Sequence, residues 1–111
     1  MQIRVLTEQV ADEIAAAVRQ LQDLGVSKVL VNLLPALGCM PWLSVGTNYR
    51  NCDSHGNMVA SMHNTALRRN LDSSQDVLLL DLYTIFSNSV QPSTGTICMH
   101  ACMMPIYVPY T

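Results

Sequence analysis

Two short apolar runs, each preceded by a segment of helical period, constrain the fold of this chain most. The first run covers residues 27–34, lies between Gly25 and Pro35, and contains two valines. The second run covers residues 77–82. Short apolar runs of this kind are typical of strands buried on both faces of a sheet. Because proline has no N–H for a sheet ladder, we expect Pro35 to end the first strand.

The first helical segment begins near Thr7. Apolar residues recur from there at spacings of three and four, which predicts an amphipathic helix. Thr7 is a suitable N-cap with Glu8 in the first turn, and Gly25 is suited to end the helix. The apolar face consists of these positions: Val10, Ile14, Val18, Leu21 and Leu24.

A second helix is predicted over residues 54–71, followed by a turn over residues 72–75. Arg68 and Arg69 stand near its end, where positive charge favours the helix dipole. A further short helical turn is expected over residues 83–89, after the second strand. The apolar side of the second helix is expected to hold Met58, Met62, Ala66 or Leu67, and Leu71.

The order helix, strand, loop, helix, strand predicts a right-handed crossover between two parallel strands. This unit builds doubly wound α/β sheets, in which helices cover both faces. Ligands bind beyond the carboxyl ends of such strands, so the loop from Pro35 and the segment after Leu82 point toward a site. Two parallel strands leave a sheet edge unpaired, and we therefore expect further elements of the fold to be missing from this sequence.

Composition excludes several classes of function. The net charge is -2 and the six basic residues are spread along the chain, which argues against nucleic-acid binding. No run approaches the roughly 18 consecutive apolar residues that a membrane span requires. The opening residues show no apolar export segment followed by a small-residue cleavage site, so no signal peptide is expected in the sequence as written.

The four cysteines form two pairs of different character. Cys39 and Cys52 flank the turn-rich loop, whereas Cys98 and Cys102 stand close together in a methionine-rich tail. A Cys39–Cys52 bridge requires an oxidising compartment, and two free thiols in a reducing one are the alternative. The spacing alone does not decide between them.

Five segments in order carry a resemblance to a known family. They are residues 24–28, residues 34–41 (Leu-Pro-Ala-Leu-Gly-Cys-Met-Pro), Cys52, residues 62–67 (Met-His-Asn-Thr-Ala-Leu) and residues 81–83 (Asp-Leu-Tyr). Over residues 7–90 the chain resembles the plant GDSL esterase/lipase family of SGNH hydrolases. The resemblance implies a flavodoxin-like, three-layer, doubly wound sheet. It places a partial hydrolase domain, from the C-terminal half of the fold, at residues 1–90, and leaves a divergent tail at residues 91–111.

The family hydrolyses carboxylic ester bonds, in lipids or acylated small molecules, with a serine activated by histidine and aspartate. The sequence contains no Gly-Asp-Ser, no Gly-x-Asn-Asp and no Asp-x-x-His. We therefore expect no catalytic residue, no cofactor and no metal ligand here, and an inactive segment of a lipid-metabolism enzyme. The string Asp53-Ser54-His55 is weighed as a catalytic remnant against a helix N-cap role for Asp53 or Ser54. Gly46-Thr47-Asn48 is expected to be a turn.

The resemblance implies scaffold roles for particular residues. It favours a bridge between Cys39 and Cys52 and a secreted, extracellular location. Gly38 and Pro35 belong to the shared turn, and His63 and Asn64 match a recurring His-Asn pair in the second helix. We expect hydrogen bonding or packing for that pair, with acid–base chemistry at His63 as the alternative.

Two alternatives remain open. The soft ligands of residues 98–102 (Cys-Met-His-Ala-Cys) make a copper or zinc site conceivable, although the spacing is not that of a zinc finger. The second alternative is that the chain is a non-catalytic binding or regulatory remnant of the hydrolase fold, which associates with another chain.

Overall fold

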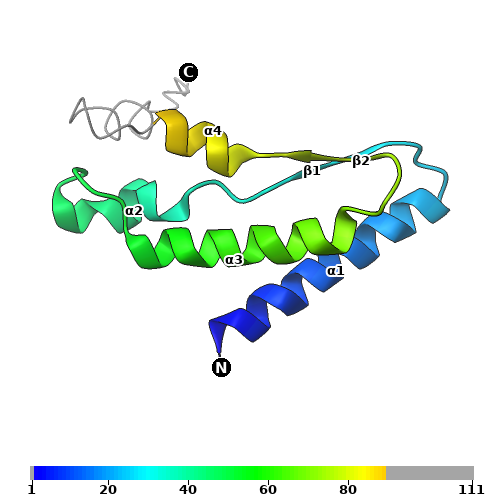
Figure 1. Cartoon of the computed structure of the whole chain (residues 1–111), viewed down its shortest axis with the longest axis horizontal. Helices are drawn as coiled ribbons and strands as arrows, with labels where there is room; N and C mark the ends of the chain where they lie inside the picture. Colours follow the sequence, from blue (N-terminus) through cyan, green and yellow to red (C-terminus); the bar gives the residue numbers. More distant parts are fainter. Residues whose placement is uncertain (1, 90–111) are drawn as a thin grey trace, which may run out of the picture.

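The computed structural model describes residues 2–89 of the 111-residue chain, and Figure 1 shows the arrangement of its elements. Two long helices and two short strands alternate, and a compact loop separates the first strand from the second long helix. In chain order the elements are α1 (Ile3–Asp23), β1 (Val29–Asn32), η1 (Leu37–Cys39), α2 (Pro41–Ser44), η2 (Val45–Thr47), α3 (Ser54–Leu71), β2 (Val77–Leu80) and α4 (Leu82–Ser89).

The two strands pair in parallel, as the sequence predicts. Val29 lies opposite Val77 and Asn32 lies opposite Leu80. The ladder extends one residue further, because the Leu33 N–H donates to the Leu80 carbonyl oxygen at 2.9 Å. In Figure 1 the strands run against the direction of α1 and α3, and both helices lie on one side of the sheet. The α/β character of the chain follows from this crossover.

The hydrophobic core lies between those two helices and the sheet. Its fully buried members on α3 and after β1 are Leu67 and Leu33, each with at most 1% of its surface exposed. Alanines on α1 let that helix approach α3 closely, and the inward side chains of both strands complete the contact. The buried cluster is Ala11, Ala15, Val18, Leu33, Ala66, Leu67 and Leu71, with Val29, Val31, Val77 and Leu79 packed against it.

The prediction that both faces of the strands are buried is wrong for the described residues. Burial alternates along each strand, so every second side chain points away from the helices. Leu30 and Leu78 are each 61% exposed, and Leu80 is 38% exposed. The described part of the chain therefore has two layers, helices on sheet, and its outer sheet face is apolar and uncovered.

The predicted apolar face of α1 is wrong at three of its five positions. Val10 and Leu21 are about two-fifths exposed and Leu24 is 83% exposed, whereas Thr7, Ala11 and Ala15 face the core. Of the predicted positions Val18 is buried and Ile14 is partly buried. Two apolar stripes run along this helix, and close approach to α3 selects the one with small side chains.

The ends of α1 differ in how well the sequence predicts them. The helix begins at Ile3, so Thr7 is not its N-cap; the Thr7 hydroxyl instead donates to the Arg4 carbonyl oxygen at 2.8 Å. The C-terminal prediction is confirmed. Gly25 has a φ of +95°, and the N–H groups of Gly25 and Val26 donate to Gln22 and Leu21, which is a Schellman ending.

Helix α3 spans the predicted residues, Ser54–Leu71. Asp53 is its N-cap, because its side chain accepts the Gly56 N–H at 2.7 Å. Met58 is 47% exposed rather than packed, and Ala60, two residues further along the helix, is buried instead. None of the helices within residues 2–89 is long and apolar enough to cross a membrane.

Candidate functional site

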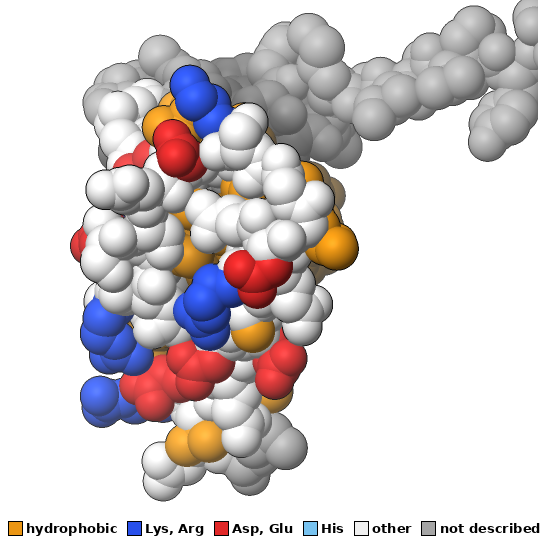
Figure 2. Space-filling model, turned by 90° about the vertical axis from the view of Figure 1, so that its right-hand side faces the viewer, with side chains coloured by type: hydrophobic (Ala, Val, Ile, Leu, Met, Phe, Trp, Pro, Cys, Tyr) orange, Lys and Arg blue, Asp and Glu red, His pale blue; other side chains and the backbone are white. Residues whose placement is uncertain are grey.

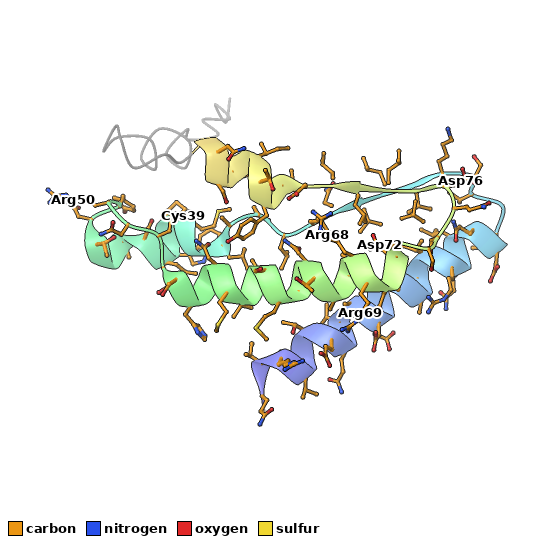
Figure 3. The ribbon with its side chains drawn as sticks, in the orientation of Figure 1. Cys39, Arg50, Arg68, Arg69, Asp72 and Asp76 are labelled. Atoms are coloured by element: carbon orange, nitrogen blue, oxygen red, sulfur yellow. A yellow bond between two sulfur atoms is a disulfide. The ribbon has the colours of Figure 1, made fainter. Side chains whose placement is uncertain are left out.

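The carboxyl ends of both strands meet one polar face of α3. Asn57, Asn64 and Arg68 lie seven and four residues apart, so their side chains share that face. Each contacts a different segment that leaves the sheet or follows it. This junction is where an α/β sheet presents a ligand site, and Figure 3 shows Arg68 pointing from α3 toward the strands.

Asn64 holds the chain where it leaves β1. The Leu34 N–H donates to Asn64 Oδ1 at 2.8 Å, and Asn64 Nδ2 donates to the Leu34 carbonyl oxygen at 2.9 Å. The amide thus pairs with the backbone N–H and carbonyl oxygen of one residue as a neighbouring strand does, and only 6% of Asn64 is exposed. This gives both Leu34 backbone groups a partner at the point where Pro35 ends the ladder.

Asn57 and Asp53 hold the following turn. The Gly38 N–H donates to Asn57 Oδ1 at 2.8 Å, and the Asp53 N–H donates to the Gly38 carbonyl oxygen at 2.8 Å. Gly38 is buried, and a Cβ there would strike the Asp53 carbonyl oxygen. A Cβ on Gly56 would lie 3.0 Å from Gly38 Cα, so the two backbones are in direct contact.

A disulfide joins Cys39 to Cys52, the pair that the family resemblance favours, with a Cα–Cα distance of 4.3 Å. Ala36 and Cys39 are buried beside it, and aromatic side chains from the loop and from α4 cover them. The packing residues are Tyr49, Tyr83 and Phe86. The bridge therefore fastens the loop to itself and gives α4 its apolar contact.

His63 is buried on α3, with 7% of its surface exposed. Burial lowers the pKa of its imidazole, because the charged form is poorly solvated there. The ring is accordingly neutral at neutral pH. Its position next to Asn64 on the packed side of the helix suits a scaffold role.

Asp81 follows β2 and anchors α4. Its Oδ1 accepts the Thr84 N–H at 3.0 Å, and its Oδ2 accepts the Thr84 hydroxyl at 2.9 Å and Arg68 Nη2 at 2.8 Å. Hydrogen bonds from Thr84 in the first place, and Arg68 in addition, hold the pKa of this carboxyl below its ordinary value. Asp81 is therefore an ionised cap, and an open groove lies beside it, lined by Ser61, Thr65, Tyr83 and Thr84.

The other candidate strings have structural positions. In Asp53-Ser54-His55 the aspartate caps α3, while Ser54 and His55 are exposed on its first turn. Thr47 lies in η2, and Asn48 ends that turn with a φ of 55°. The Thr47 hydroxyl accepts the Asn51 N–H at 3.1 Å, which closes the turn on itself.

Metal-ligating groups do not gather in the described part of the chain. Among residues 2–89 no group of three or more histidine, cysteine, aspartate or glutamate side chains is placed to hold a metal ion. The alternative metal site at residues 98–102 lies outside the described residues.

Asn57 is the contact residue that sequence reasoning missed. Its amide holds Gly38 and donates to Cys39 Sγ at 3.7 Å, yet it belongs to no motif. The one available signal is its spacing of seven residues from Asn64, which is two helical turns and therefore the same face.

Three comparisons with known proteins bear on this site. The chain is similar to three Arabidopsis thaliana proteins, each named GDSL esterase/lipase. Two of them are 32% and 28% identical to it over 85 residues, a match that covers 71% of this chain and 24% of each relative. The third is 34% identical over 96 residues, which covers 75% of this chain and 26% of the relative. The chain thus spans about a quarter of the length of the curated relatives it matches. No family model and no solved structure matches it.

Proposed function

We propose that this chain is a segment of a GDSL-type ester hydrolase with the SGNH fold, and that residues 1–90 supply scaffold at the carboxyl ends of two strands. The observation that carries the proposal is the pairing of the Asn64 amide with the backbone N–H and carbonyl oxygen of Leu34. It explains in physical terms why His63-Asn64 and the Leu-Pro-Ala-Leu-Gly-Cys run occur together. The similarity to GDSL esterase/lipases over 85 residues supports the assignment.

The proposed reaction class is hydrolysis of carboxylic esters in lipids or acylated small molecules. Such hydrolysis needs a serine, a histidine that activates it and donors for the oxyanion. The sequence lacks the three motifs that carry these groups in the family. Our proposal therefore assigns positioning roles to Gly38, Asn57 and Asn64 and no catalytic role, and it requires neither cofactor nor metal.

The disulfide supports an extracellular or secretory location for the folded segment. Disulfides persist in oxidising compartments and are rare where thiols are kept reduced. The Cys39–Cys52 bridge closes a separation of 13 residues and packs under Tyr49 and Tyr83.

A chimera tests the scaffold proposal. The 85-residue match of this chain replaces the corresponding segment of an Arabidopsis GDSL esterase/lipase, and hydrolysis of p-nitrophenyl butyrate is measured. We expect the chimera to retain hydrolysis and the Asn64→Ala chimera to lose it. The Met58→Ala chimera is the control and is expected to hydrolyse the ester as the chimera does, because Met58 is 47% exposed. A soluble, folded chimera without hydrolysis would count against the assignment.

A second measurement tests the absence of a nucleophile. The purified chain is treated with a fluorophosphonate probe, which labels activated serines, beside an intact relative as the positive control. No labelling and no ester turnover are expected. Labelling of the chain would overturn the proposed scaffold role.

The uncovered apolar surfaces favour a second candidate, a non-catalytic binding or regulatory remnant. Leu30 and Leu78 on the outer sheet face are each 61% exposed. Association with another chain would remove this apolar surface from water, which is favourable. Size-exclusion chromatography with light scattering distinguishes the candidates. A stable monomer argues against association through this face.

A further inference from the structure

The loop between β1 and α3 exposes three large apolar side chains at one end of the molecule. Trp42 is 67% exposed, Val45 is 55% exposed and Leu43 is 40% exposed. Trp42 and Val45 are three residues apart along consecutive helical turns, so they project from the same side. We call these three residues the tip patch.

The backbone under the tip patch is fixed. Ser44 is fully buried, and its hydroxyl and N–H both donate to the Met40 carbonyl oxygen at 3.0 Å. Leu43 lies against Gly56 at the start of α3, and the Cys39–Cys52 disulfide closes the base of the loop. The tryptophan is thus displayed on an ordered turn that does not need to rearrange in order to bind.

Charge at this end is sparse: the loop carries Arg50, and Asp53 follows it as the N-cap of α3, with its carboxylate bound to the Gly56 N–H. Residues 37–52 contain one ionisable charge, the exposed Arg50, and Figure 3 shows it at the tip beyond Cys39. The opposite end is different, because Figure 2 shows side chains of both signs spread over it. Asp23 ends α1, and Lys28, Asp72 and Asp76 lie in the connections there.

We propose that the tip patch docks on the surface of a lipid bilayer that contains anionic headgroups. Tryptophan favours the boundary between headgroups and acyl chains, because its ring is apolar and its N–H needs a polar partner. Val45 enters the acyl side of that boundary beside Trp42, while Leu43 supports them from its contact with Gly56. The Arg50 guanidinium pairs with headgroup phosphate. The docking is peripheral and uses no nucleophile, so it goes beyond the proposed scaffold role and does not depend on it.

The fluorescence of the unmodified chain tests this directly, since Trp42 is the only tryptophan in the sequence. Vesicles of phosphatidylcholine, with and without phosphatidylglycerol, are titrated into the full chain. We expect the emission to shift to shorter wavelength and to be quenched by lipids brominated near the headgroup. Binding to the anionic vesicles is expected to be about fivefold tighter, the effect of one basic residue near such a surface.

Matched variants locate the contact. In a vesicle sedimentation assay, Trp42→Ala is expected to weaken binding about tenfold, since it removes a large apolar side chain from the boundary. Arg50→Gln is expected to abolish the preference for phosphatidylglycerol and to leave binding to neutral vesicles unchanged. Leu24→Ala, at the opposite end and 83% exposed in the starting chain, is the control and is expected to bind as the parent does.

Two outcomes overturn the proposal. One is unchanged emission and no sedimentation with either vesicle. The other is a shift that appears without lipid and grows with protein concentration, which assigns the tip patch to self-association. Because neither readout involves hydrolysis, a chimera that fails to hydrolyse esters leaves this result unaffected.

Discussion

Two halves of this molecule are stabilised in different ways. The half formed by α1, α3 and the sheet is held by apolar packing, with Leu67 and Leu33 fully buried at its centre. The loop between β1 and α3 has a small buried cluster, Ala36 and Cys39, and is held by the disulfide and by hydrogen bonds that its backbone N–H groups donate to side chains on α3.

The difference concerns how specific each residue must be. Apolar packing tolerates exchanges of similar volume, because it depends on area and shape. A hydrogen bond from an amide to a buried peptide group depends on which atom donates and which accepts, and a broken one leaves an unpaired polar group. We therefore expect the packed half to respond to volume and the loop to respond to atom identity.

The largest effect is expected in the packed half. Leu67→Ala removes a side chain with 0% exposure, and we expect the free energy of unfolding to fall by about 2–5 kcal/mol. Urea unfolding followed by circular dichroism measures it. Leu78→Ala, on the exposed sheet face, is the matched control and is expected to cost less than about 1 kcal/mol. Equal losses in the two variants would place the packing centre elsewhere.

The disulfide is expected to rank next. Replacing Cys39 and Cys52 by serine reopens a loop of 13-residue separation and should lower the free energy of unfolding by about 3 kcal/mol. Hydrogen exchange should show the greatest loss of protection within residues 37–53. If α1 and α3 lost protection to the same extent as that loop, the two halves would not be separable.

Asn64 tests atom identity in the loop. Asn64→Ala leaves the Leu34 N–H and carbonyl oxygen without their partner, and we expect a loss of about 1–3 kcal/mol in urea unfolding. Asn70→Ala on the same helix is the control, since the Asn70 bond to Asp12 is exposed, and is expected to cost below about 0.5 kcal/mol. A control as costly as Asn64→Ala would contradict the contrast between the halves.

The smallest effect is a dependence on pH. Burial lowers the pKa of His63 in the folded protein, so the unfolded chain binds the proton first as pH falls. The contribution of neutral His63 to stability is therefore fully present above about pH 6.5, the ordinary pKa of histidine. This contribution is lost as pH falls through the lower pKa of His63 in the folded state. His63→Gln should remove this part of the pH profile of the thermal midpoint.

Asp81→Asn serves as the comparison for His63→Gln, because it alters a different pH window. The lowered pKa of Asp81 adds stability above about pH 4 that is lost as pH falls through the folded-state pKa. The Asp81 side chain is 38% exposed, so the change is expected to stay below about 1 kcal/mol. If the thermal midpoint of His63→Gln depended on pH below about 6.5 as that of the parent does, His63 would not be the cause of the pH dependence.

The sequence predicts the packed half in outline. The bounds of α3, the parallel pairing and the glycine ending of α1 follow from periodicity and from backbone preferences. The buried face of α1 does not, because the helix carries two apolar stripes and only the fit against α3 decides between them. The exposure of Leu30 and Leu78 was not predicted for a similar reason. The apolar pattern of a strand does not indicate which element, if any, covers each of its faces.

The loop is less predictable for a different reason. Its contacts run from side chains to backbone atoms that are distant in sequence, such as Asn57 to Gly38 and Asn64 to Leu34. Residue type records that an amide is present but not which peptide group it meets. The resemblance to a family therefore identified Gly38 and Asn64, while Asn57, which belongs to no motif, was found only in the structure.

The contact between Gly38 and Gly56 limits which amino-acid substitutions this turn can accept during evolution. A side chain at Gly38 would meet the Asp53 backbone, and one at Gly56 would meet Leu43 and the Gly38 backbone. Substitutions at other positions alter side chains and cannot shorten a main chain, so no second-site change makes room at Gly38. We expect any chain that keeps this turn to keep both glycines together.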